Sequence, residues 1–323
     1  MKLRLIASIA VTLFFSMTSL CFADVDLCSQ SAELGRTDDI IKECTRQIKG
    51  EVKTDNLARS YLFRGLAYQV TGRFDEALSD FAKAIKLAPK DDKAYNDRGS
   101  TYLLKGRLDQ AVSDFNEAIR LNPKNAHAYF NRGTVRQALG RTDQAAGDFT
   151  RAIELDPANA RAYLSRGNTY LSNERTEEAI MDFSKAIELK PGYDEAYSNR
   201  GAAYLSKGKI DQAIADFSKA VELNPNYDEA YSNRGAAYMA KGQLDRAVDD
   251  YSKAIELNPK DTSAYYNMAC LQSVRKNVQE SCAWLQKAVD KGYDKWEHMK
   301  NDPDLKNVRE AACYKKIMER KSV

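Results

Sequence analysis

Residues 194–227 read DEAYSNRGAAYLSKGKIDQAIADFSKAVELNPNY, and residues 228–261 read DEAYSNRGAAYMAKGQLDRAVDDYSKAIELNPKD. The two stretches have the same length of 34 residues and agree at most positions. Four earlier stretches follow the same pattern, so a period of this length predicts a repeat architecture, in which each unit packs on its neighbours. Glycines recur at this period at Gly65, Gly99, Gly133, Gly167, Gly201 and Gly235.

The residues around each of these glycines predict a pair of helices. Tyrosine stands four residues before each glycine and, except at Arg136, three residues after it. These spacings place the three positions on one face of a first helix, and the missing side chain of glycine lets a second helix approach closely. Prolines from Pro89 to Pro259 end the second helices. The aromatic residues expected to fill the space beneath the glycines are Phe81, Phe115, Phe149, Phe183, Phe217 and Tyr251.

The pattern Tyr-x3-Gly-x2-Tyr, then Ala-x3-Phe-x2-Ala and Pro, resembles the tetratricopeptide repeat family, with tyrosine in place of the family's frequent tryptophan. The resemblance implies an all-α fold: a right-handed superhelical solenoid of antiparallel helix pairs with C-terminal capping helices. The expected parts are a degenerate opening hairpin at 24–57, repeats at 58–91, 92–125, 126–159, 160–193, 194–227, 228–261 and 262–295, and a cap at 296–323.

The first 23 residues read as a secretory signal peptide. Lys2 and Arg4 precede an apolar run from Leu5 to Phe15, and small residues precede the expected cleavage site after Ala23. We therefore expect an exported protein, periplasmic or secreted, with no membrane span after cleavage. The alternative is a chain anchored in the membrane by an uncleaved signal, although the apolar run is shorter than the ~20 residues of a spanning helix.

Charge and motifs argue against nucleic acid and against catalysis. Without Lys2 and Arg4 the 49 basic residues become 47, against 46 acidic ones, so no basic surface for nucleic acid is expected. The two histidines, His127 and His298, occupy unrelated positions, which leaves no plausible metal cluster or histidine-based triad. The sequence contains no phosphate-binding loop. We expect a non-catalytic chain without cofactor or metal.

An arginine precedes each glycine, and an aspartate follows sixteen residues after the arginine. In an antiparallel hairpin these positions face each other, which predicts structural ion pairs; a row that binds acidic or phosphate groups is the alternative. The seventh repeat lacks both partners and has Met268 and Trp284 instead. The expected pairs include Arg98 with Asp114, Arg132 with Asp148, and Arg200 with Asp216.

Five cysteines remain after cleavage, and export permits disulfides. Cys28 and Cys44, like Cys270 and Cys282, lie symmetrically about expected hairpin turns. We therefore expect the bridges Cys28–Cys44 and Cys270–Cys282, with Cys313 free or bonded between molecules. The alternative is that these cysteines are small buried apolar residues.

A row of polar residues stands two positions before the glycines, about 200° around the first helix from them. We call it the polar row, and we expect it to line the concave groove and bind the backbone of an extended peptide or partner protein. Amides suit this task because they both donate and accept hydrogen bonds. His127, early in a first helix, is a further candidate. The alternative function is a structural subunit of an envelope or secretion assembly that contacts partners by its outer surface. The polar row consists of Asp97, Asn131, Ser165, Asn199, Asn233 and Asn267.

Overall fold

The computed structural model describes residues 37–50 and 54–320. All regular structure within these ranges is helical, and consecutive helices pack as pairs, as the repeat pattern predicts. The expected signal peptide at 1–23 lies outside the described residues. The chain divides into two compact units, with the division between Asn173 and Glu174.

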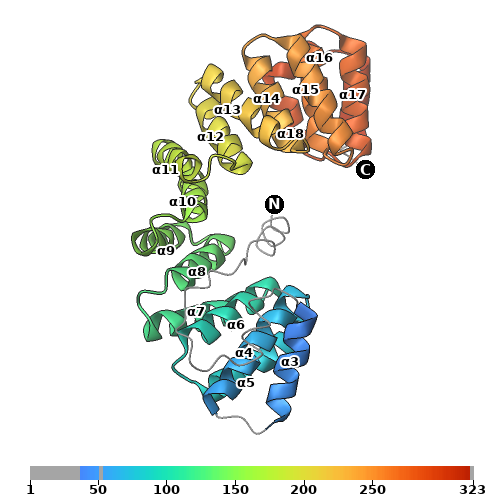
Figure 1. The fold of residues 1–323 in the computed structure, drawn as a ribbon. Helices are drawn as coiled ribbons and strands as arrows, with labels where there is room; N and C mark the ends of the chain where they lie inside the picture. The colour runs from blue at the N-terminus through green and yellow to red at the C-terminus, as the bar shows by residue number, and fades with distance from the viewer. Residues whose placement is uncertain (1–36, 51–53, 321–323) are drawn as a thin grey trace. The chain divides into compact units, whose positions relative to one another are not determined.

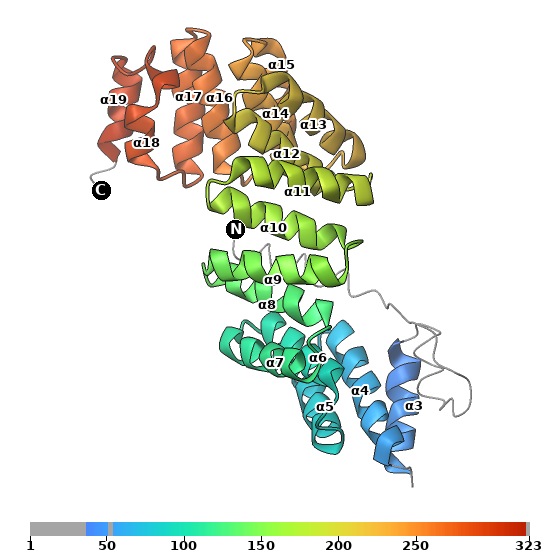
Figure 2. The same cartoon turned by 90° about the vertical axis from the view of Figure 1, so that its left-hand side faces the viewer.

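Unit 1 holds α3 and the first repeats. In Figure 2 the helices α8, α9 and α10 lie side by side in chain order. From α4 onward, even-numbered helices are the first helices of the repeats and odd-numbered helices are the second. The helices of unit 1 are α3 (Thr37–Lys49), α4 (Thr54–Val70), α5 (Phe74–Leu87), α6 (Asp92–Leu104), α7 (Leu108–Leu121), α8 (Ala126–Ala138), α9 (Thr142–Leu155) and α10 (Ala160–Ser172).

Unit 2 continues the pattern and ends in the cap, in orange and red in Figure 1. Its helices are α11 (Thr176–Leu189), α12 (Asp194–Ser206), α13 (Ile210–Leu223), α14 (Asp228–Ala240), α15 (Leu244–Leu257), α16 (Thr262–Val274), α17 (Val278–Asp290), α18 (Trp296–Asn301), the 3-10 helix η1 (Pro303–Leu305) and α19 (Ala312–Glu319).

The close approach of the two helices depends on glycine. A Cβ atom added at Gly133 would lie 2.9 Å from Cε1 of Phe149, whose side chain is fully buried. Gly99 stands in the same relation to Phe115. Five repeats therefore build their cores from an aromatic ring of the second helix placed against a glycine of the first, as the sequence predicts; these glycines are Gly65, Gly99, Gly133, Gly201 and Gly235.

The turn after the first helix also requires glycine in most repeats. Gly106 has a φ of +71° and Gly140 a φ of +73°, the left-handed region in which L side chains are strained. Lys276 adopts the same conformation, with a φ of 67°, in the divergent seventh repeat.

The cap extends the core beyond the last repeat. Buried residues of the cap, among them Met299, Leu305 and Tyr314, pack against Tyr265 and Tyr266 of α16. The Tyr314 hydroxyl donates to the backbone oxygen of Met299 over 3.0 Å. The described helices include none that is both long and apolar enough to cross a membrane.

Candidate functional site

In five of the repeats the arginine and the aspartate lie together between the two helices. Arg98 donates to Asp114 from Nε and from Nη2, over 2.8 Å in each case. The hydrogen bond with Asp114 raises the pKa of Arg98 and outweighs the opposing effect of burial. Equivalent two-point contacts, between 2.6 and 3.0 Å long, join Arg64 to Asp80, Arg132 to Asp148, Arg200 to Asp216 and Arg234 to Asp250.

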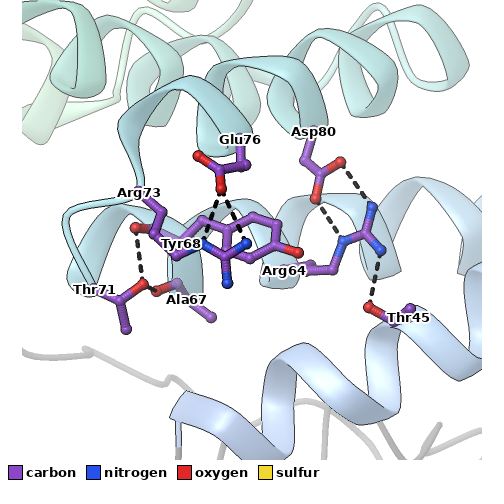
Figure 3. A network of polar contacts seen from close by, with 8 residues as sticks. All are labelled: Thr45, Arg64, Ala67, Tyr68, Thr71, Arg73, Glu76 and Asp80. Atoms are coloured by element: carbon purple, nitrogen blue, oxygen red, sulfur yellow. Dashed lines mark hydrogen bonds and ion pairs between the residues drawn. The ribbon is translucent and has the colours of Figure 1, made fainter.

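Several of these arginines also reach the preceding pair of helices. In Figure 3 the Arg64 guanidinium lies between Asp80 of α5 and Thr45 of α3, to which Nη1 donates over 2.9 Å. Four arginines therefore each join their first helix to two second helices: Arg64, Arg132, Arg200 and Arg234. The same contact joins Arg132 to Asn116, Arg166 to Thr150, Arg200 to Ser184 and Arg234 to Ser218.

The polar row lies on the first helices, on the side away from the glycines. Within each unit, successive first helices contact one another: α4 with α6, α6 with α8 and α8 with α10 in unit 1, and α12 with α14 and α14 with α16 in unit 2. We call this side of each unit the first-helix face. Every member of the polar row is partly exposed there.

Two asparagines of the polar row bridge adjacent first helices. Asn131 Nδ2 donates to Asn96 Oδ1 over 3.0 Å and to Ser100 Oγ over 3.2 Å, both on the preceding first helix. Asn267 Nδ2 donates to Ser232 Oγ over 3.3 Å. Within the described ranges, by contrast, no hydrogen bond of the Asn233 side chain is found. Asn131 and Asn267 therefore help to hold adjacent first helices together.

Asp97 and His127 differ from the amides around them. Burial raises the pKa of Asp97 to about 7, although the Asn96 amide, which donates to its Oδ1 over 3.2 Å, favours the charged form. His127 is exposed in the first turn of α8, four residues before Asn131 and hence on the same side of the helix.

The structure corrects the expected pairing of Cys270 with Cys282. Cys282 of α17 is bonded to Cys313 of α19, with the two Cα atoms 6.0 Å apart. Cys270 is a buried free thiol that donates to Asp302 Oδ2 over 3.6 Å. The cap brings Cys313 to the second helix of the last pair, so the disulfide ties the cap to the repeats and does not lock the hairpin. Cys44 is disulfide-bonded; Cys28, its expected partner, lies outside the described residues.

An open pocket of about 350 Å³ lies where the polar row of unit 2 meets the cap. Of its lining residues only Asn267 is a predicted site residue. Ser263 has a sequence signal, because it stands four residues before Asn267, whereas Lys295 ends the divergent seventh repeat and His298 of the cap has no counterpart in other repeats. The pocket is lined by Ser263, Tyr266, Asn267, Tyr293, Lys295 and His298.

A buried polar cluster supports this pocket from beneath. The Tyr266 hydroxyl donates to Asp302 Oδ2 over 2.5 Å, and the rings of Tyr266 and Tyr293 are stacked 4.4 Å apart. Burial raises the pKa of Tyr266 and of Cys270 well above their ordinary values. In the part of the chain that the structure describes, no group of three or more His, Cys, Asp or Glu residues is arranged to hold a metal ion.

Solved structures with similar folds are repeat proteins. A tetratricopeptide repeat protein from Parabacteroides merdae is 20% identical, with 78% of this chain and 98% of that chain covered and a TM-score of 0.59. PilF of Pseudomonas aeruginosa is 19% identical over 72% and 99%, with a TM-score of 0.56. YrrB, described as a TPR protein with an unusual peptide-binding site, is 24% identical over 57% and 95%, with a TM-score of 0.50. A comparison with curated proteins found no match.

Models of a protein family also match the sequence directly. Four models of the tetratricopeptide repeat match the chain and together cover residues 58–288 without a gap. They match 99–140 and 201–242; 58–91 and 228–261; 130–194; and 81–113, 183–215 and 251–288. The chain therefore belongs to the tetratricopeptide repeat family, an all-α solenoid of helix pairs that typically serves as a non-catalytic scaffold for protein–protein interaction.

Proposed function

We propose that this chain is a non-catalytic scaffold that binds an extended segment of a partner protein along its first-helix face, through the polar row. The observation that carries the proposal is the run of partly exposed polar side chains at one position of successive first helices. An extended peptide offers a donor and an acceptor at every residue, and amides pair with both whatever the side chains of the peptide.

The open amide of Asn233 supports this function better than a purely structural role. Asn131 and Asn267 use Nδ2 to bridge helices, which leaves their Oδ1 atoms as acceptors. Asn233 offers both its Nδ2 donor and its Oδ1 acceptor, and the exposed small residue Ala202 lies three residues after Asn199 on α12. Each amide contact would contribute about 0.5–1.5 kcal/mol to binding, so several together would support a stable complex.

Site-specific photo-crosslinking tests which surface holds the partner. A photoreactive amino acid at Ala202, on the first-helix face, is compared with the same residue at Ala215, on α13; both alanines are exposed and belong to the same pair of helices. The variants are incubated with the native envelope fraction. We expect a crosslinked partner from position 202 and none from position 215.

The reverse pattern would contradict the proposal. Crosslinks from position 215 alone would indicate the alternative function, a structural subunit of an envelope or secretion assembly that uses its outer surface. A second experiment combines the photoreactive residue at position 202 with alanine at both Asn199 and Asn233. If the polar row binds the partner, the crosslink from position 202 should then weaken.

We also propose that the protein is exported and that residues 1–23 are removed. The charged start, the short apolar run and the small residues before position 24 support this. The intact mass of protein from its native host should correspond to a chain that begins at Asp24. A full-length chain in the membrane fraction would indicate an uncleaved anchor instead.

A further inference from the structure

The pocket between α16 and the cap closes one end of the first-helix face of unit 2. Asn267, the last member of the polar row, is one of its walls, and Ser263 stands one helical turn before it. Lys295 and His298 form the opposite side, from the segment between α17 and α18 and from α18 itself. A peptide lying along α14 and α16 would therefore place a side chain at this pocket.

The floor of the pocket is rigid and aromatic. Tyr266 and Tyr293 are each about 5% exposed and are stacked almost in parallel, with an interplanar angle of 7°. The His298 ring lies 5.5 Å from the Tyr266 ring, tilted by 46°. A volume of about 350 Å³ over such a floor is at the lower end of the range for small-ligand sites, enough for one long side chain.

The polar groups around the opening favour an anion. The six lining residues include no acid. Lys295 carries a positive charge and is exposed, the His298 side chain is 59% exposed, and the Ser263 hydroxyl is a further donor.

The carboxylate beneath the pocket, that of Asp302, is engaged by other groups. Asp302 is only 9% exposed; its Oδ2 accepts from the Tyr266 hydroxyl and its Oδ1 accepts from the backbone N–H of Asp304 over 2.9 Å. His298 Nε2 lies 3.5 Å from Asp302 Oδ2. A cationic ligand in the pocket would be repelled by Lys295. A carboxylate would be attracted by Lys295 and could accept hydrogen bonds from the donors around the opening.

We propose that this pocket binds an acidic side chain, glutamate or aspartate, of the peptide held along the first-helix face of unit 2. Lys295 supplies the charge, and His298 and Ser263 supply hydrogen-bond donors. The stacked tyrosines receive the methylene groups of the side chain. This proposal rests on the proposed function and adds to it a residue preference at one position of the ligand.

The test uses the full chain and an array of acetylated, amidated decapeptides, so that neither terminus of a peptide carries a charge. The peptides have randomised sequences and occur in pairs that differ only by glutamate against glutamine at one position. We expect the best binders to prefer glutamate about tenfold, the effect of roughly one charge-assisted hydrogen bond. Lys295→Gln should abolish the preference for glutamate.

Lys300→Gln is the matched control, because Lys300 is exposed on α18 and does not line the pocket. His298→Gln is a second variant in case Lys295→Gln misfolds, and circular dichroism checks both. Peptides that bind without any preference for glutamate, or an equal loss in Lys295→Gln and Lys300→Gln, would overturn the pocket proposal and leave the scaffold proposal standing. An array in which no peptide binds would overturn both.

Discussion

Arg234 and Asp250 form a two-point ion pair in the interior of their repeat, with Nε donating to Oδ2 over 2.8 Å and Nη2 donating to Oδ1 over 2.7 Å. Their side chains are 17% and 7% exposed. Nη1 donates to Ser218 of the preceding repeat over 3.3 Å. Because both charges are largely removed from water, the net contribution of the pair to stability over apolar residues is small.

This burial predicts an asymmetry between single and double substitutions. Asp250→Ala leaves the Arg234 guanidinium buried without its partner, and we expect a loss of about 3–5 kcal/mol in the free energy of unfolding. Arg234→Met with Asp250→Leu should recover most of that loss, since Met268 already occupies the arginine position in the seventh repeat and is buried there. Urea unfolding measures both. Equal losses in the single and double variants would contradict this account.

The polar row predicts two classes of asparagine. Asn131→Ala removes two hydrogen bonds to the preceding helix, so we expect a loss of about 1 kcal/mol in stability, reduced by the higher helix propensity of alanine. Asn233→Ala should leave stability unchanged or slightly raised, and should weaken partner binding about tenfold. Thermal unfolding and affinity for a captured partner separate the two effects. Similar behaviour of both variants in both assays would be evidence against this division.

The repeat pattern is sufficient to predict the helices, the core and the ion pairs. The pattern predicts that the ring of Phe115 packs against Gly99, where the missing side chain leaves room for it. The structure shows this arrangement. The distance of sixteen residues from Arg98 to Asp114 matches facing positions of a hairpin, so periodicity alone identifies a contact that is distant in sequence.

Features that depend on the cap could not be predicted in this way. Cys282 lies symmetrically opposite Cys270 in its hairpin, but the cap adds a competing partner, Cys313, from outside the repeat scheme. His298 of the cap lines the pocket for the same reason. The contact from Asn131 to the preceding helix was also missed, because the pattern within one repeat does not show how closely the next first helix approaches.

Asp97 predicts a pH dependence of stability. Its pKa of about 7 in the folded protein lies above the ordinary value of 3.8, chiefly through burial. Between these two values the folded chain holds a proton that the unfolded chain has released, so stability should fall as pH rises from about 4 to about 7. The loss is at most about 4 kcal/mol, since each tenfold change in proton affinity corresponds to ~1.4 kcal/mol.

Asp97→Asn should remove this part of the pH dependence. The variant should be more stable than the parent at pH 8 and similar to it at pH 4, as measured by denaturant midpoints at each pH. Asp109→Asn, at an exposed position on α7 in the same repeat, is the matched control and should leave the pH profile unchanged. A parent that is equally stable at pH 5 and pH 8 would show that the Asp97 carboxyl is ionised throughout.

The disulfide between Cys282 and Cys313 predicts that the cap is stabilised by its covalent link to α17. Peptide mapping without reduction should recover a fragment that links Cys282 to Cys313, with Cys270 labelled only after denaturation. The bond closes a loop with a sequence separation of 31, for which the chain-entropy model gives about 3–4 kcal/mol. Cys313→Ser should therefore speed hydrogen exchange in α18 and α19, whereas Cys270→Ser leaves the bond in place. A fragment that links Cys270 to Cys282 would refute the pairing.

Two glycines of the third repeat predict opposite effects of the same substitution. Gly133 lies against the Phe149 ring, and an added Cβ would approach Cε1 to 2.9 Å and Asp148 Cβ to 3.2 Å. Because the ring is fully buried, it has no room to move, and Gly133→Ala should cost about 1–3 kcal/mol. Gly147 lies on the exposed side of α9, and nothing stands within 4 Å of an added Cβ. Gly147→Ala should therefore raise stability by about 0.5–1 kcal/mol, through higher helix propensity. Urea unfolding of the two variants beside the parent gives the comparison. If Gly133→Ala stabilised the protein as much as Gly147→Ala, the close approach of α8 to α9 would not depend on glycine.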